Sequence, residues 1–443
     1  MMRFNFRSTV QTTVTMGVAI AALSFPSLPA VAQTLSEKIL AMETSLEREF
    51  EDYFGADLAE VTQNPADIAQ TLAEVGTATG TKPAVLWAIP RGDHLHLVLI
   101  TPNGEPVVRD LYDVDDATLR RTVRAFHREI QFSLSGNPLQ GSQQLHQWLI
   151  EPFEADFLAT EEIDTILFCL GNGLRSLPLA ALYDGEQFLL EKYSLTRIPA
   201  FNLIQTDYVN LDAGAFLAMG ASQFEDQSPL PSVPLELDTI TQELTVARPP
   251  QAQWQGETFL NEAFTLDNLE RSLSTQQPEI VHLATHALFE GNDPESSYIQ
   301  LWQNKLRLSD FDEISWNSPA IELLILSACR TAVGDDEAEL GFAGLALQAG
   351  VKSAIASLWD VSDTGTLILM SEFYRQLGQT TTKAEALRQA QLAMLRGDAR
   401  IAEGQLVLPR GTMPLPEVLQ DTDITDLSAP FYWAGFTMIS SPW

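Results

Sequence analysis

Two short apolar segments of this chain each end on a side chain that can take part in covalent catalysis. Residues 281–286 read VHLATH and end on His286, and residues 323–329 read LLILSAC and end on Cys329. If both segments are strands of one parallel sheet, the two side chains emerge together at its carboxyl edge, where open α/β sheets place their sites. A thiol becomes an effective nucleophile when a base or a cation favours the thiolate. The two segments therefore indicate a cysteine–histidine pair suited to nucleophilic catalysis, the pairing that a cysteine peptidase needs.

A structural role is the alternative for the cysteine. A small thiol that ends a buried strand most often serves packing alone. Cys169, the second of the chain's two cysteines, lies in the apolar segment 165–170 and has that role by default. Two cysteines do not make a disulfide framework. A disulfide between Cys169 and Cys329 is a further alternative in an oxidising compartment, and it would inactivate the nucleophile.

The histidines do not predict a metal site. His282 lies four residues before His286, and on a strand this spacing spans about 13 Å, too far for two ligands that each sit about 2 Å from one ion. We expect His282 to pack in the core. His94 and His96 share one face of a predicted strand, but no third ligand is in view beside them, and we interpret them as exposed hairpin residues. No glycine-rich phosphate loop follows an early strand, which argues against a nucleotide-binding protein. We also predict no metal ion and no other cofactor.

The elements that must position the pair follow from hydrophobic periodicity. Apolar residues at spacings of three and four predict helices, and short apolar runs bounded by turn residues predict strands. Up to residue 205 the predicted helices span 37–54, 64–76, 115–130 and 145–149, and the predicted strands span 84–89, 94–101, 106–114, 165–170 and 193–198. This mixed order indicates an α+β half over residues 33–205.

Strands and helices alternate after residue 211, which is typical of a mostly parallel sheet. The predicted strands span 215–219, 253–257, 280–285, 322–328, 353–358 and 432–439, and the predicted helices span 234–246, 266–273, 339–348, 364–377 and 384–395. Residues 409–425 are predicted to be a loop, long enough to act as a flap. We therefore predict an α/β fold in which residues 206–443 form the half that carries the pair and residues 33–205 extend its sheet.

The start of the chain has the features of a secretory signal peptide over residues 1–32. Arg3 and Arg7 supply the basic end, residues 14–23 are mostly apolar, and Ala-Val-Ala at the end of the leader is a small-x-small cleavage site. We predict cleavage after Ala32 and export to the periplasm, a lumen or the extracellular space; an uncleaved anchor is the alternative. No later segment approaches 18 uninterrupted apolar residues, so we expect no stable membrane insertion after cleavage.

The chain is strongly acidic. It has 443 residues, and 59 Asp and Glu against 26 Lys and Arg give a formal net charge of −33. Such a surface repels nucleic acid and anionic lipid and attracts basic partners, although acidic surfaces often serve solubility alone. We expect a protein or peptide substrate and no nucleic acid, and the oligomeric state stays open.

Six motifs follow one another along the chain: GLRSLPLAAL at 173–182, HLATH at 282–286, LSACRT at 326–331, GFAGLA at 341–346, SLWDVSD at 357–363 and EALRQAQ at 385–391. In this order they resemble the CHAT-domain proteins, of the caspase-like and separase-like group of cysteine peptidases. The resemblance implies a caspase-like α/β fold with a mostly parallel sheet flanked by helices. It further implies that His286 is the catalytic base, that Cys329 is the nucleophile, and that the backbone amides of Ala287 and Cys329 bind the oxyanion.

Ala287 departs from the family pattern, because the family usually has glycine after this histidine. Alanine retains the amide but restricts backbone angles that glycine allows. The shape of the oxyanion hole therefore depends on the backbone conformation at Ala287. Many relatives also carry tetratricopeptide repeats before this domain, and here only about 30 residues separate the leader from the helix that starts near Asn64, too few for a repeat array.

Carboxylates near the predicted nucleophile suggest a substrate preference. Asp335 and Asp336 lie in the acidic segment after Cys329, and Asp360 and Asp363 follow the next predicted strand. If one of them lines the pocket for the substrate residue before the cut, cleavage after arginine or lysine follows. The alternative is a solvated loop with helix-capping aspartates.

The leading hypothesis is an exported, caspase-like cysteine endopeptidase with a His286–Cys329 dyad. The alternative is a non-catalytic module that keeps the fold as a protein-interaction scaffold, since an exported thiol is exposed to oxidation. Selective alkylation of the thiol distinguishes the two, because only an activated thiolate reacts rapidly near neutral pH.

Overall fold

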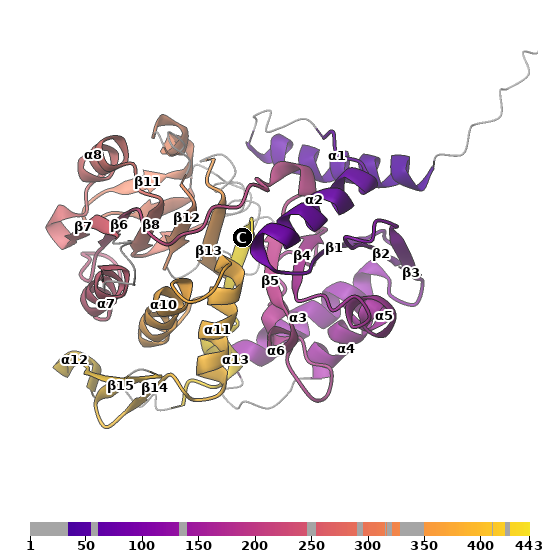
Figure 1. Ribbon diagram of the computed structural model, residues 1–443. Helices are drawn as coiled ribbons and strands as arrows, with labels where there is room; N and C mark the ends of the chain where they lie inside the picture. Colours follow the sequence, from indigo (N-terminus) through magenta and orange to yellow (C-terminus); the bar gives the residue numbers. More distant parts are fainter. Residues whose placement is uncertain are drawn as a thin grey trace, which may run out of the picture.

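One large sheet organises the protein in the computed structural model (Figure 1). Its eleven strands follow the order β3-β2-β1-β4-β5-β17-β13-β12-β8-β6-β7, and helices cover both of its faces. The predicted α/β fold, with a mostly parallel sheet flanked by helices, is confirmed. The residues that the structure describes are 34–54, 61–132, 140–245, 254–289, 296–314, 316, 321–327, 350–409, 411–420 and 426–443.

The first part of the chain builds one end of this sheet. β1, β2 and β3 are antiparallel neighbours, whereas β1, β4 and β5 run parallel. The strands are β1 (Pro83–Pro90), β2 (Leu95–Ile100), β3 (Val107–Leu111), β4 (Thr165–Leu170) and β5 (Ser194–Ile198), and the helices are α1 (Leu35–Phe54), α2 (Pro65–Thr79), α3 (Asp116–Phe132), α4 (Gln140–Leu149), α5 (Glu151–Phe153) and α6 (Leu189–Lys192).

Strand β4 is buried on both faces, which explains its continuous apolar sequence. Successive side chains of a strand point to opposite faces. Ile166 and Phe168 accordingly pack in the core that contains α3 and α4, and Leu167 and Cys169 pack in the core that contains α1 and α2. Cys169 therefore has the packing role that the sequence suggested.

Helix α2 shows how local sequence sets an element's ends. Asn64 caps its start by accepting hydrogen bonds from the next turn, and Pro65 occupies the first helical position. The helix continues past Gly76, where the sequence predicted its end, and stops at Gly80 with φ +74°. Gly76 serves a close approach instead, because a Cβ atom there would lie 2.8 Å from the Thr81 carbonyl oxygen.

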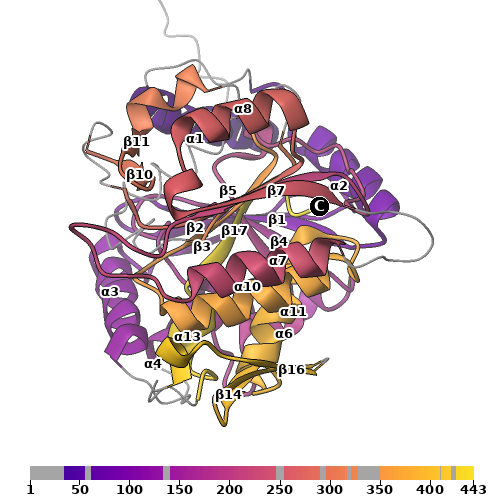
Figure 2. The same ribbon diagram turned by 90° about the vertical axis from the view of Figure 1, so that its left-hand side faces the viewer.

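The second part of the chain builds the other end of the sheet. In the large sheet, the described strands of this part run parallel except β17, which is antiparallel to β13. Helix α8 lies with α1 on one face, and α7, α10 and α11 lie on the other (Figure 2). The strands are β6 (Ala215–Gly220), β7 (Gln255–Leu260), β8 (Ile280–Ala284), β12 (Leu323–Leu326), β13 (Ser353–Ser357) and β17 (Phe436–Ser440), and the helices are α7 (Val233–Thr245), α8 (Leu266–Gln276), α10 (Asp363–Leu377), α11 (Lys383–Leu395) and α13 (Pro430–Trp433).

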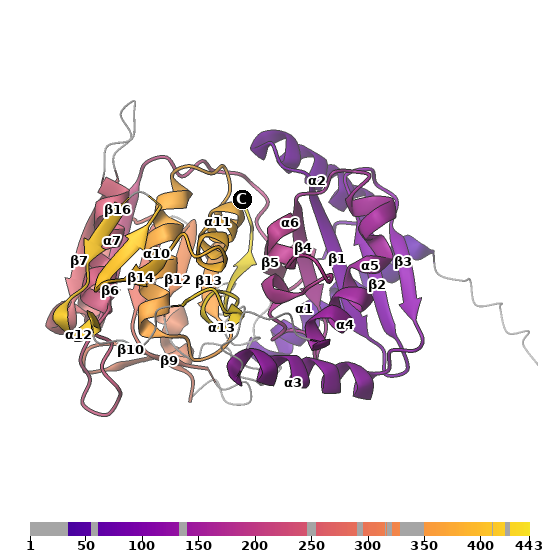
Figure 3. The same ribbon diagram turned by 90° about the horizontal axis from the view of Figure 1, so that it is seen from below.

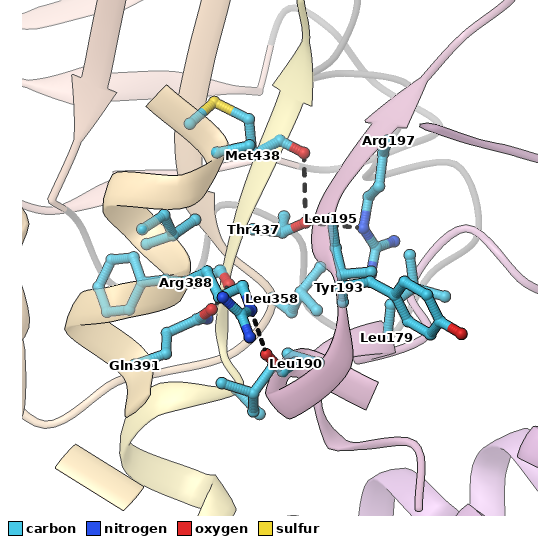
Figure 4. Close-up of a pocket in the computed structure, with 15 residues that line it drawn as sticks. Leu179, Leu190, Tyr193, Leu195, Arg197, Leu358, Arg388, Gln391, Thr437 and Met438 are labelled. Atoms are coloured by element: carbon cyan, nitrogen blue, oxygen red, sulfur yellow. Dashed lines mark hydrogen bonds between the residues drawn. The ribbon is translucent and has the colours of Figure 1, made fainter. Parts of the chain in front are cut away.

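The two parts join at β5 and β17, which pair in parallel through Arg197 and Ile439. Helix α11 strengthens the junction, because the Arg388 guanidinium donates hydrogen bonds to the carbonyl oxygens of Leu190, at 2.6 Å, and Glu191, at 2.7 Å. Figure 4 shows Leu190, Arg197 and Arg388 among the side chains around a cavity of about 20 Å³. A space of that size holds about one water molecule, so this place is a packed junction and not a substrate site.

Two small sheets lie beside the large one. β9 (Ala287–Leu288), β10 (Tyr298–Gln300) and β11 (Lys305–Arg307) form the first, and β14 (Arg400–Ala402), β15 (Gln405–Leu408) and β16 (Gly411–Pro414) form the second, followed by α12 (Glu417–Gln420). The prediction of an unbroken loop over 409–425 is wrong because it contains β16 and α12. β16 is mostly exposed and so lacks the apolar alternation that announces a strand.

The predicted helix over 339–348 lies outside the described residues. Among the residues that are described, no helix combines the length and the apolar character needed to cross a bilayer.

Candidate active site

The two segments that carry the predicted pair are neighbouring strands. β8 and β12 run parallel, and their register pairs Leu283 with Leu326. The ladder continues one residue further, because the Ser327 amide donates a hydrogen bond to the Leu283 carbonyl oxygen at 3.1 Å. His286 follows β8 at this edge of the sheet, and Cys329 lies outside the described residues. The strands leading to both positions therefore end side by side.

The imidazole of His286 is held by the loop between β6 and α7. Its Nε2 atom lies 2.8 Å from the Ser228 carbonyl oxygen, and its ring packs against Phe224 with the ring centroids 4.6 Å apart. Because a carbonyl oxygen only accepts hydrogen bonds, this contact assigns a proton to Nε2. The Nδ1 lone pair of the neutral ring is then available to accept a proton.

Ala287 fits its position without the backbone freedom of glycine. It belongs to β9 and has a negative φ, so alanine is unstrained there. The register pairs Ala287 with Ile299, and the Gln300 amide donates to the His286 carbonyl oxygen at 2.8 Å. His286 and Gln300 therefore form a hydrogen-bonded pair of the antiparallel ladder, and the next pair, Ala287 and Ile299, is a non-hydrogen-bonded pair. The Ala287 amide is directed away from β10 for this reason. The amide is therefore not used by the β9–β10 ladder.

The structure describes only some of the carboxylates that were predicted to line a substrate pocket. Asp335 and Asp336 lie outside the described residues. Asp360 is exposed in the segment between β13 and α10. Asp363 is the first residue of α10, and its Oδ2 atom accepts a hydrogen bond from the Ser232 amide at 2.9 Å. This bond ties α10 to the residues before α7.

An open hollow of about 1040 Å³ adjoins the loop that holds His286. Phe224, which contacts the imidazole, forms part of its wall, and the exposed side chains of Glu225 and Asp226 continue that wall. The rest of the lining includes residues of β10 and β11, among them the basic side chains of Lys305 and Arg307. The hollow is large enough to accept several residues of a peptide, since drug-sized ligands occupy about 300–1,000 Å³.

A buried carboxyl group on α7 links the middle of β8 to the residue that follows β12. Glu236 is 1% exposed. Its Oε1 atom accepts hydrogen bonds from Ser327 Oγ, at 2.5 Å, and from His282 Nε2, at 3.0 Å. Ser327 stands two positions before Cys329 in the sequence. One carboxyl oxygen thus binds both Ser327, which precedes the predicted nucleophile, and His282, which lies on the strand that leads to the predicted base.

His282 is buried, as predicted, and Tyr374 on α10 completes its surroundings. The Tyr374 hydroxyl lies 3.2 Å from His282 Nδ1. Burial raises the pKa of Tyr374 well above its ordinary value, and the nearby Glu236 carboxyl group adds to this effect. The hydroxyl therefore keeps its proton and donates a hydrogen bond to Nδ1, which places the imidazole proton of His282 on Nε2, facing Glu236.

Four residues of the site were not predicted from the sequence: Ser228, Glu236, Ser327 and Tyr374. Ser228 acts through its backbone carbonyl group, which every residue has, so no sequence signal marks it. Glu236 does carry a signal, because it falls at helical spacing among the buried side chains of Val233, Leu237 and Ile240. A carboxyl group on the apolar face of a helix must find a buried partner.

Asp363 should make the stability of the protein depend on pH. Burial raises its pKa to about 6, although the Ser232 hydrogen bond opposes the rise. Because the folded protein binds this proton more tightly than the unfolded chain, the contribution of Asp363 to the free energy of unfolding falls as pH rises from about 4 to about 6. Asp363→Asn, which keeps a hydrogen-bond acceptor, should match the wild type at pH 4 and exceed it at pH 7 by up to about 3 kcal/mol. Urea unfolding at both pH values measures this, and a pH-independent difference would refute it.

Residues 140–441 match the family model of the CHAT domain. No curated protein sequence matches the chain significantly. Among solved structures, the Saccharomyces cerevisiae separase–securin complex at 2.6 Å resolution matches with a TM-score of 0.53 and 12% identity, covering 93% of this chain and 34% of that chain. The same complex at 3.0 Å resolution matches with a TM-score of 0.50 and 11% identity, covering 85% and 30%.

The Arg-specific cysteine proteinase gingipain R of Porphyromonas gingivalis matches with a TM-score of 0.40 and 11% identity, over 74% of each chain. The chain spans about a third of the length of the separase chain that it matches. At these identities the likeness to separase concerns the fold.

Proposed function

Because the chain belongs to the CHAT-domain family, we propose that it is a cysteine endopeptidase with Cys329 as nucleophile and His286 as general base. The observation that carries this proposal is the parallel pairing of β8 with β12, in which Leu283 is level with Leu326. His286 and Cys329 each follow this level by the same number of residues. If the two segments continued in register beyond this pair, the thiol and the imidazole would come together at the edge of the sheet.

The thiol proton passes from Cys329 Sγ to Nδ1 of His286, since the Nε2 proton is engaged by the Ser228 carbonyl oxygen. The thiolate then attacks the carbonyl carbon of the scissile bond, and the carbonyl oxygen takes the negative charge. We assign the binding of this oxyanion to the backbone amides of Ala287 and Cys329. The Ser228 carbonyl group meanwhile orients and stabilises the imidazolium ion.

The intermediate collapses when Nδ1 of His286 donates its proton to the departing amine, which leaves a thioester on Cys329. A water molecule then transfers a proton to Nδ1 and attacks the thioester carbonyl carbon. When this second intermediate breaks down, the acid product leaves and the proton on Nδ1 returns to the Cys329 sulfur. One water molecule is consumed for each peptide bond cut, and the dyad returns to its starting state.

The substrate residue before the cut is, in this proposal, basic. Glu225 and Asp226 support this preference, because both are exposed on the loop that contacts the imidazole and both line the hollow, although Lys305 and Arg307 of β11 line the same hollow. The net charge of −33 would also attract a basic peptide. Asp335, Asp336 and Asp360 are further candidates for the same pocket. The leader pattern over residues 1–32, which lies outside the described residues, supports a site of action outside the cytoplasmic membrane.

Hydrolysis of a peptide library by the purified full chain tests the proposal. We expect cleavage after arginine or lysine to be at least about tenfold faster than after leucine or glutamate, which corresponds to about 1.4 kcal/mol of transition-state binding. A preference for acidic or apolar residues would overturn the basic specificity and leave the peptidase standing. Absence of any cleavage, together with an alkylation-inert Cys329, would overturn the peptidase and favour a non-catalytic protein-interaction module.

A further inference from the structure

Three side chains with metal-binding atoms meet on one face of the hairpin formed by β2 and β3. One ligand atom each from His94, His96 and Asp110 lies within 4.8 Å of the others. The Oδ1 atom of Asp110 lies 2.6 Å from His96 Nδ1 and 3.6 Å from His94 Nε2. Two ligands of one tetrahedral zinc ion lie about 3.4 Å apart, so small side-chain rotations suffice to reach that geometry. The sequence showed the two histidines, and the structure supplies the third ligand.

The strand register brings the third ligand into place. Asp110 on β3 is the cross-strand partner of His96 on β2. His94 lies in the bend just before β2, two residues from His96, and its Nε2 atom lies 3.6 Å from Asp110 Oδ1. Leu95 and Leu97, which alternate with the histidines, are fully buried. The ligand side chains therefore stand on a rigid support, which keeps the cost of ordering them low.

A carboxylate orients His94 in the way that is common at metal centres. Asp93 Oδ1 lies 2.7 Å from His94 Nδ1, so Nδ1 carries the proton and Nε2 presents its lone pair on the side of Asp110. Metal-bound histidines usually donate their second ring N–H to such a carboxylate or carbonyl group. The Tyr112 ring packs against the imidazole with centroids 4.8 Å apart and restricts its rotation further.

The charges around the cluster leave room for a cation. Within the described part of the chain, the ion-pair partners of Asp110 are these two histidines, and no lysine or arginine pairs with it. Partial exposure of the side chains, 19% for His94, 24% for His96 and 33% for Asp110, gives an ion access from solvent.

A second cluster with metal-binding atoms differs from this one because a lysine already neutralises it. His146, Glu154 and Asp184 also bring three ligand atoms together. There, the Lys192 ammonium group already lies 2.6 Å from Glu154 and pairs with Asp184. A lysine thus takes the position of the cation, and the cluster has no need of a metal ion.

We propose that His94, His96 and Asp110 bind a divalent first-row transition-metal ion, for which Zn²⁺ is the best-matched probe. Imidazole nitrogens select this class of ion over Mg²⁺ and Ca²⁺. Two histidines, one carboxylate and a water molecule complete a four-coordinate zinc site. β2 and β3 lie at the end of the sheet remote from β12 (Figure 3), so the ion takes no part in the proposed dyad.

Isothermal titration of the untagged full chain with Zn²⁺ tests the site. The parent protein carries Cys329→Ala, so that the proposed catalytic thiol cannot contribute a ligand. We expect one ion per chain with a Kd of about 1 μM or below, and binding at least about tenfold weaker at pH 5.5 than at pH 7.5, because protonated imidazoles cannot coordinate. His96→Ala and Asp110→Asn should each weaken binding at least about tenfold. Asp93→Asn should weaken it about tenfold by releasing His94.

His146→Gln is the matched control, because it removes the histidine of the cluster that Lys192 already neutralises. It should bind Zn²⁺ like the parent, and circular dichroism should show that every variant is folded. The proposal is overturned if the parent does not bind at 100 μM Zn²⁺, or if His96→Ala and Asp110→Asn both bind like the parent. Loss of binding in His146→Gln alone would also overturn it, by moving the ion to the other cluster. If His96→Ala fails to fold, Asp93→Asn and Asp110→Asn decide the outcome.

Discussion

Cys329→Ala is expected to reduce peptide hydrolysis by at least about a thousand-fold and to leave the thermal unfolding temperature within about 2 °C of the wild type. Removal of the nucleophile of a covalent mechanism eliminates the acyl-enzyme route, and such losses reach about a million-fold in well-studied hydrolases. The substitution deletes one sulfur atom and introduces no new group to accommodate. Initial rates with the best library peptide, together with thermal unfolding followed by circular dichroism, measure both quantities.

Cys169→Ala is the matched control, because it removes the chain's other thiol. Cys169 is fully buried, its Sγ atom donates a hydrogen bond to the Pro199 carbonyl oxygen at 3.1 Å, and burial raises the pKa of its thiol well above the ordinary value. We expect this variant to retain activity and to lose about 1–2 kcal/mol of unfolding free energy through the lost hydrogen bond and a small cavity. Equal loss of activity in both variants would show that the cysteines act structurally.

Glu236→Ala should give the second-largest effect, on stability and on activity together. The substitution leaves Ser327 Oγ and His282 Nε2 buried without their acceptor, and each orphaned group costs about 1–3 kcal/mol. Because Ser327 is no longer held two positions before Cys329, we also expect kcat to fall by roughly a hundredfold, as misplacement of a reacting group by about 1 Å can cause. Urea unfolding and steady-state kinetics well below the unfolding temperature separate the two effects.

Glu236→Gln distinguishes positioning from loss of fold. The amide keeps an oxygen in the same place, so it can still accept from Ser327 and His282. We expect this variant to recover most of the kcat that Glu236→Ala loses. If both variants keep wild-type kcat while folded, or if Glu236→Ala raises KM alone, Glu236 has no role in positioning the nucleophile.

The sheet could be predicted from the sequence wherever burial on both faces produces a continuous apolar run. Segment 165–170 is β4 as predicted, and segment 280–285 extends only one residue beyond β8. A continuous apolar run did not reveal the strand within 409–425, because the short, exposed β16 is held by hydrogen bonds to β15 and buries little of its own surface. The sequence also gave no sign of the small sheet that begins at Ala287, since its strands have only two or three residues.

The site was predictable only as far as it is encoded along the chain. His286 and Cys329 were identified because each ends an apolar run, and the register of β8 with β12 supports that interpretation. Partners that come from other elements were not predictable. Ser228 offers only a carbonyl group, and Asp110 becomes a neighbour of His96 through a strand register that depends on the geometry of the hairpin.

Proton exchange between the Cys329 thiol and the His286 imidazole is tested most directly by the pH dependence of Cys329 alkylation. The rate of modification by iodoacetamide is followed by mass spectrometry of the peptide that contains Cys329, in the wild type and in His286→Ala. We expect the wild-type thiol to react with an apparent pKa well below the ordinary value of about 8.5, and His286→Ala to return it to about that value. The rate at pH 7 should then fall at least about tenfold. Identical profiles in the two proteins, both centred near pH 8.5, would contradict the dyad.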